Sequence, residues 1–167
     1  GGLMAEERVA ALLRVEGVAG VVRELDQLDA DHVYAIYVEE LLRQADLSEG
    51  QAVALVEDAT RRVESDHYLA SMLAALAPRH LGSDRVLDAF LAASGTLESD
   101  HYRAQVLALA LERGELGTGA LVALLRSAAE LESDHNLAEV LRGVSSRYAL
   151  QPGLRSANQG TVESIES

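Results

Sequence analysis

Three copies of a Glu-Ser-Asp-His tetrapeptide carry the side chains that hydrolases and metal sites use. They begin at Glu64, Glu98 and Glu132. Serine, histidine and a carboxylate can form a catalytic triad, and histidine with carboxylates can bind zinc. Triad members come from separate segments that converge in a cleft, whereas these side chains are neighbours in sequence and diverge. We therefore expect no catalytic residue in the motif and no enzyme.

A metal site would need ligands from more than one copy of the motif. Packed helices lie about 8–10 Å apart, whereas zinc binds nitrogen at about 2.0–2.1 Å. Histidines of adjacent copies could share an ion only if they leaned together, and one copy offers two ligands at most. His80, the fifth histidine, has no equivalent in the other copies. The sequence therefore predicts neither a metal nor another cofactor.

The Asp-His pair marks an internal repeat. It occurs four times, with spacings of 35, 34 and 34 residues, at Asp31, Asp66, Asp100 and Asp134. Small or aliphatic residues follow each Asp at offsets of four, seven and ten; in the second copy they are Ala70, Leu73 and Leu76. These offsets follow one face of a helix, so each copy predicts a helix that begins at the motif.

Each unit then breaks and starts a second helix. Ser48, Ser83 and Thr118 stand at the breaks, where they can cap, and Ser48 with Gln51 matches a capping box. Pro152 fits the first helical position of the last unit. The second helices are predicted at 50–63, 84–96, 119–131 and 153–165. A helix pair split by Gly17 is predicted before the units, at Ala5–Arg14 and Val18–Leu28.

These units predict an all-α fold, an α-solenoid of stacked helix–turn–helix repeats of about 34 residues, because such units bury their apolar faces only against neighbours. The predicted parts are an N-terminal capping pair at 1–30 and repeats at 31–65, 66–99, 100–133 and 134–167. The next Asp would follow Ser167 directly, so we expect a fragment of a longer array. In the last unit Asn158 and Gln159 replace Leu124 and Leu125, which suits a terminal repeat.

The motif also has a structural interpretation within these units. Its serine directly precedes a first helix, where an N-cap contributes about 1 kcal/mol. Its Asp lies in the first turn, where a carboxylate interacts favourably with the positive helix end. In the first unit Ala30 replaces the serine, and Asp29 or Asp31 could substitute as the cap. Only the histidine has no clear structural reason.

A binding surface is another interpretation of the motif. We define the repeat-edge rail as the row of Glu64, Asp66, His67, Glu98, Asp100, His101, Glu132, Asp134 and His135. An acidic row could bind a protein or peptide with a basic patch, and a merely solvated helix edge is the alternative. Two residues after the Asp, Tyr68 and Tyr102 are interpreted as packing between repeats.

Composition excludes several functional classes. The chain has 27 acidic residues against 14 basic ones and a formal net charge of −13, so we expect no nucleic-acid partner. It contains no cysteine, which excludes a disulfide framework and a thiolate nucleophile. No apolar run of about 18 residues predicts a membrane span, and no signal-peptide pattern is present. The oligomeric state stays open.

The segments "SDHYRAQVL", "SDHYLASML" and "SDHNLAEVL", with the closing "ESIES", resemble bacterial repeats that begin with an "SDYE"-type motif. The likeness covers nearly the whole chain, although histidine stands here in all four units where the family usually has tyrosine. Such HEAT-like arrays occur in uncharacterised proteins and in non-peptidase regions of proteins related to antibiotic-sensing BlaR-type membrane metallopeptidases. The resemblance implies a regulatory or interaction domain without protease activity, because no His-Glu-x-x-His motif is present.

We therefore expect a non-catalytic module that binds a protein or peptide, in the cytoplasm or in the soluble part of a membrane-associated bacterial protein. The alternatives are a spacer or scaffold within a longer array, and a small-molecule or enzymatic pocket near the C-terminal repeat. A groove would favour the binding module. One deep pocket with convergent polar groups would favour the enzyme, and homogeneous repeats would favour the spacer.

Overall fold

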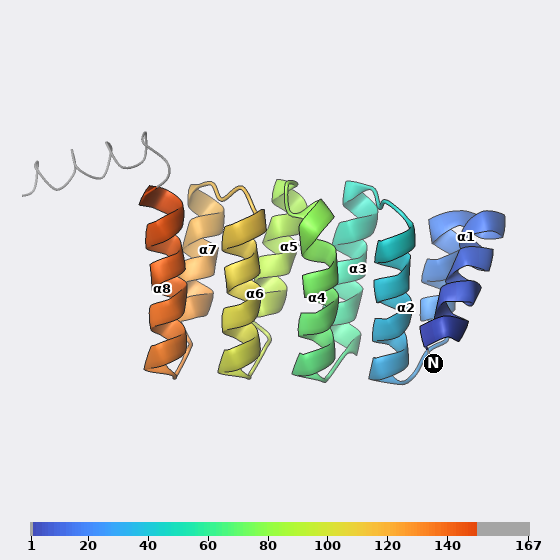
Figure 1. The fold of residues 1–167 in the computed structure, drawn as a ribbon, viewed down its shortest axis with the longest axis horizontal. Helices are drawn as coiled ribbons and strands as arrows, with labels where there is room; N and C mark the ends of the chain where they lie inside the picture. Colours follow the sequence, from blue (N-terminus) through green and yellow to red (C-terminus); the bar gives the residue numbers. More distant parts are fainter. Residues whose placement is uncertain (1, 150–167) are drawn as a thin grey trace, which may run out of the picture.

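The computed structural model describes residues 2–149, which form eight helices and no strand (Figure 1). The all-α prediction is confirmed for this part of the chain. The helices are α1 (Gly2–Leu25), α2 (Asp31–Gln44), α3 (Glu49–Arg62), α4 (Asp66–His80), α5 (Asp84–Ser94), α6 (Asp100–Arg113), α7 (Thr118–Ala129) and α8 (Asp134–Ala149). None of the described helices combines the length and the apolarity needed to cross a bilayer.

The helices lie in two rows. In one row α2, α4, α6 and α8 each pack against the next member, and in the row behind it α3, α5 and α7 do the same (Figure 1). The loops that precede α4, α6 and α8 lie along one edge of the molecule, the lower edge in Figure 1. The aliphatic residues at the predicted offsets are buried between the rows, as Leu73, Leu76 and Leu107 show.

Helix α1 bends sharply at Gly17. The backbone there has φ 72° and ψ −167°, a conformation that is essentially restricted to glycine. The predicted split at Gly17 is thus confirmed, but the second segment ends at Leu25 and not at Leu28. It ends early because the chain turns, and the guanidinium of Arg62 donates to the carbonyls of Leu25 (2.9 Å) and Leu28 (2.6 Å).

The second helices differ slightly from their predicted ranges. Helix α3 runs one residue earlier at both ends, and α5 and α7 stop two residues before 96 and 131. They stop because Leu97 and Leu131 leave the helix and are buried (0% and 6% exposed). The predicted cap at Thr118 is wrong, since Gly117 occupies the N-cap of α7 and offers no side chain. The prediction at 153–165, including Pro152, lies outside the described residues.

Serine caps form as predicted at the other helix starts. Ser48 and Gln51 make both bonds of a capping box at α3, and Ser83 caps α5. The motif serines accept the predicted amide bonds from Tyr68 (3.3 Å), Tyr102 (3.4 Å) and Asn136 (3.2 Å). Ala30 has no side-chain cap, and neither predicted substitute takes its place. Asp31 cannot cap because its carboxylate binds elsewhere, as shown below.

Candidate functional site

The aspartates of the repeated motif bind the backbone of the next copy. Asp66 Oδ2 accepts hydrogen bonds from the amides of Glu98 (2.9 Å) and Ser99 (2.7 Å). Equivalent bonds join Asp31 to Glu64 (2.9 Å) and Ser65 (3.0 Å), and Asp100 to Ser133 (2.6 Å). We call these bonds the carboxylate links. They hold each loop against the preceding front-row helix, a role that helix-dipole reasoning alone did not predict.

Two of the repeated histidines, His32 and His67, contact the next unit as well. The Nδ1 atom of His67 lies 2.9 Å from the hydroxyl of Tyr102, and the two ring centroids are 5.7 Å apart. His32 and Tyr68 form a wider pair, with centroids 6.3 Å apart. The imidazoles of His32 and His67 thus have a structural contact. Tyr68 and Tyr102 pack between units as predicted.

The structure brings the repeat-edge rail to one edge, beside the N-termini of α4, α6 and α8. Its exposed members are Glu64, Glu98, Glu132, Asp134, His67, His101 and His135. Asp66 and Asp100 are half-buried, and their carboxylates are used by the carboxylate links. The exposed part of the repeat-edge rail therefore consists mainly of glutamates and imidazoles. Binding of a partner by the rail stays a prediction.

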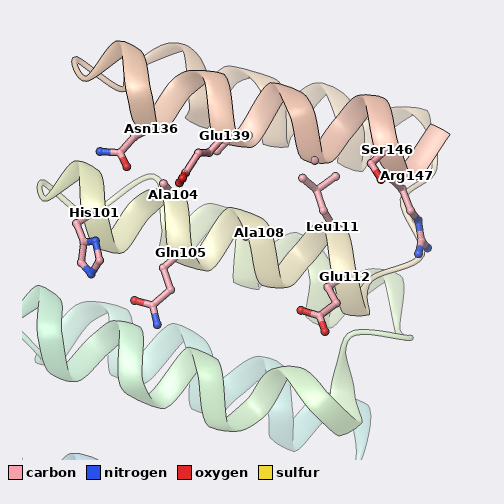
Figure 2. A pocket seen from close by; sticks show the side chains of 12 residues that line it. His101, Ala104, Gln105, Ala108, Leu111, Glu112, Asn136, Glu139, Ser146 and Arg147 are labelled. Carbon is pink, nitrogen blue, oxygen red and sulfur yellow. The ribbon is translucent and has the colours of Figure 1, made fainter. Parts of the chain in front are cut away.

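A groove lies between α6 and α8 on the face of the front row (Figure 2). Its volume is about 500 Å³. The floor is formed by small or aliphatic residues: Ala104, Ala108, Leu111, Val140 and Gly143. Polar side chains surround the floor: His101, Gln105, Glu112, Asn136, Glu139, Ser146 and Arg147. This size suits a ligand or a short peptide segment, since ligand sites range from about 300 to 1,000 Å³.

Helix α8 differs from α6 at two positions beside the groove. Asn136 stands where α6 has Tyr102, and Gly143 stands where α6 has Leu109. A Cβ atom at Gly143 would lie 3.0 Å from Leu111 Cδ1, so the glycine lets this leucine side chain approach the backbone of α8 closely. The residues that the units share, on which the sequence predictions rest, include neither Asn136 nor Gly143. Alignment of the units position by position would have found both.

Two carboxylates give the groove a negative character. The side chain of Glu139 is 53% exposed and lies 3.2 Å from His135 Nε2. That of Glu112 is 66% exposed and lies 3.8 Å from Arg113 Nε. Such exposed pairs are weak and exchange readily with other cations. The groove can therefore accept a cationic group at either carboxylate.

Arg147 is the one arginine that lines the groove. Its Nη2 donates to the carbonyl of Gly114 (2.8 Å), so the guanidinium ties the end of α8 to the loop after α6. Ser146 is beside it, whereas His101 lies at the opposite end of the groove (Figure 2). A serine and a histidine so far apart do not form a nucleophile–base pair.

The described titratable groups with a shifted pKa lie outside the groove. Burial and a hydrogen bond to Asp58 (2.5 Å) raise the pKa of the Tyr34 hydroxyl, and Arg62 stacks 4.6 Å from that ring. Burial also lowers the pKa of His80, near the turn after α4. Within residues 2–149, no group of three or more His, Asp or Glu side chains is placed to hold a metal ion.

Comparison with known proteins adds no relative. A scan of protein-family models, a search of curated proteins and a search of solved structures each finds no match to the chain. The likeness to "SDYE"-type repeats therefore stays a prediction. The described part of the chain is an all-α protein with two rows of helices and a groove between α6 and α8.

Proposed function

We propose that the chain is a non-catalytic α-solenoid that binds a peptide segment bearing basic groups in the groove between α6 and α8. The groove is the observation that carries the proposal. The two rows of helices support the solenoid, because each front-row helix packs on the helix one unit further along. The carboxylate links support it as well, since they join residues 32–34 positions apart.

A spacer explains the groove less well. A spacer benefits from uniform packing, yet α8 has Asn136 and Gly143 where α6 has Tyr102 and Leu109. Glycine inside a helix also costs about 1 kcal/mol relative to alanine. A site that accepts a partner accounts for a stability cost of this kind. The alternative of a pocket around Asn158 and Gln159 concerns residues outside the described part.

The repeat-edge rail would extend the same binding surface. His101 and Asn136 line the end of the groove next to the rail, because both stand in the first turn of their helices. A partner longer than the groove would continue from this end over Glu98 and Glu132, which are exposed. The glutamates of the rail and of the groove favour a basic partner, although Arg147 lines the far end of the groove.

Refilling the groove tests the proposal. Gly143→Leu gives α8 the residue that α6 has, and Asn136→Tyr does the same at the other position. Asn136→Tyr should fold at least as stably, because it offers His101 the partner that Tyr102 offers His67, whereas Gly143→Leu must displace the Leu111 side chain and should melt lower. Both variants should lose binding. Gly119→Leu is the matched control, since nothing lies within 4 Å of a Cβ atom at that glycine of α7.

The probe is a display library of random peptides selected on the 167-residue chain. Enriched peptides should bind the unchanged chain and the Gly119→Leu variant, and bind neither groove variant, with basic residues over-represented. Circular dichroism and melting curves check that every variant folds. Peptides that bind all variants alike, or a library with no enriched peptide, would overturn the proposal and favour the spacer.

A further inference from the structure

Helices α7 and α8, at the end of the stack opposite α1, expose leucines of a kind that the other units bury (Figure 1). Leu125 is 36% exposed and Leu141 is 45% exposed, whereas Leu91 and Leu107, at the equivalent positions one unit earlier, are 3% and 0% exposed. With Val122 these two leucines define the end face, which no other described helix covers. We infer that the end face binds the same face of a second copy of this chain in a weak two-fold dimer, an inference that is independent of the proposed function.

Helix α7 lacks the charges of the back-row helix before it. Three charged residues of α5 are replaced by uncharged ones in α7: Asp84 by Thr118, Arg85 by Gly119 and Asp88 by Val122. Asp88 is exposed even though α7 packs against α5, so packing of another unit does not bury this position. Val122 is nevertheless apolar and 41% exposed, and with Leu125 and Ala129 it forms one exposed stripe of α7, at offsets of three and seven. A partner explains this apolar stripe better than a longer array does.

Charge favours a second copy as the partner. Each of the other seven described helices carries at least one acidic residue, whereas α7 has none and carries only Arg126. The whole chain has a net charge of −13, which repels a second copy over most of the surface. This repulsion is weakest where α7 is exposed, so two copies can approach each other there. A basic partner, in contrast, finds no carboxylate on α7 to bind.

Residues 150–167 are the competing cover for the end face, because they follow α8 directly. In the 34-residue register Asn158 and Gln159 stand at the positions of Leu124 and Leu125. Amide groups that pack on leucine side chains lose hydrogen bonds with water, and this costs free energy unless other partners replace them. A second copy instead brings the leucines and the valine of its own end face, so apolar side chains meet apolar side chains.

The size of the end face predicts a weak dimer. Helix α7 has 12 residues and α8 has 16, so at 1.5 Å per residue they are about 18 and 24 Å long. Two packed helices lie about 8–10 Å apart and together present a face about 20 Å wide. Each copy therefore offers about 400 Å², and two copies bury about 800 Å² in total. Stable interfaces bury about 1,200–2,000 Å², so we expect a Kd on the order of 10–100 µM.

A two-fold contact covers the end faces of both copies at once. It uses the same patch on each copy, so the assembly closes at two chains. A head-to-tail contact would place the end face on α1 of the next copy, and the last copy would always leave its end face in water. None of the three end-face residues lines the groove between α6 and α8, so the dimer leaves the groove open.

Sedimentation velocity of the 167-residue chain at concentrations from about 5 to 500 µM tests the dimer. The mass should rise from 17.8 kDa toward twice that value, and added salt should tighten the dimer because it screens the repulsion between acidic chains. Leu125→Glu and Leu141→Glu should each raise the Kd about tenfold or more, because the new carboxylate is buried without a partner. Val15→Glu is the matched control, since this valine of α1 is 79% exposed at the other end of the stack, and it should leave the Kd unchanged. Circular dichroism checks that every variant folds.

A mass of 17.8 kDa at every concentration would overturn the inference. Growth beyond two copies, or loss of association in Val15→Glu, would overturn it as well, because either result indicates a head-to-tail contact. Ile165→Glu tests the competing cover, and the inference requires an unchanged Kd for this variant. A dimer that forms only in Ile165→Glu would mean that residues 150–167 cover the end face of the unchanged chain, and the inference would then be wrong.

Discussion

Replacement of Asp66 by alanine should destabilise the fold by more than the loss of an ordinary surface acid. The carboxylate accepts two backbone hydrogen bonds, from the amides of Glu98 and Ser99. A hydrogen bond to a charged group contributes about 1.5–3 kcal/mol, and partial exposure lowers that value, so we expect a total loss of about 2–3 kcal/mol. In a chain of this length such a loss lowers Tm by about 5–10 °C.

Thermal unfolding followed by circular dichroism measures this loss, with Asp88→Ala as the control. Asp88 is exposed on α5, so its removal relieves a similar repulsion in an acidic chain without breaking a link. Hydrogen exchange should show faster exchange at the amides of Glu98 and Ser99 in the Asp66 variant alone. Equal melting temperatures for the two variants, or unchanged protection at both amides, would refute the reasoning.

Three further variants test other parts of the fold. Gly17→Ala should destabilise by about 1–3 kcal/mol because of its backbone conformation, whereas Gly50→Ala should be neutral or stabilising, and chemical denaturation compares the two. Arg103→Leu should cost about 2–4 kcal/mol in the same assay, because this buried guanidinium donates to three carbonyls after α5 and in α7; a loss below that of a surface arginine would contradict this. The Ser83 hydroxyl donates to Glu49 (2.6 Å) and, with Arg85, holds the pKa of Glu49 below its ordinary value. Glu49 therefore stabilises the fold at pH values above its ordinary pKa, and this stabilisation is lost as the pH falls through the lowered pKa. Ser83→Ala should raise the pKa of Glu49 in an NMR titration. An unchanged titration would contradict the assignment.

Sequence patterns predicted most of the described secondary structure because its signals are local. The period of the Asp-His pair, the serine caps and the aliphatic offsets each depend on a few neighbouring residues. The errors fall at helix ends where a tertiary contact decides. Leu97 leaves its helix early to be buried, and Arg62 binds the carbonyls at the end of α1.

The groove could not be predicted in the same way. The residues that the units share predict the rail of repeated Glu, Asp and His. The groove depends on residues that differ between units, Asn136 and Gly143, and a search for shared residues passes over such differences. The carboxylate links were missed because the acceptor and the amides are about one whole unit apart, so only the packing of α4 on α6 brings them together.

The carboxylate links stand on one edge of the stack, and this has a mechanical consequence. At that edge every described front-row junction beyond α2 is tied by the same bond, whereas the opposite edge has unlike contacts, such as Glu49 with Ser83 and Arg147 with Gly114. The linked edge would act as a hinge line. Neighbouring units could tilt about it while the carboxylate links stay formed. A tilt of this kind would separate α6 from α8 first at the end of the groove that carries Arg147, where it must break the bond from Arg147 to Gly114.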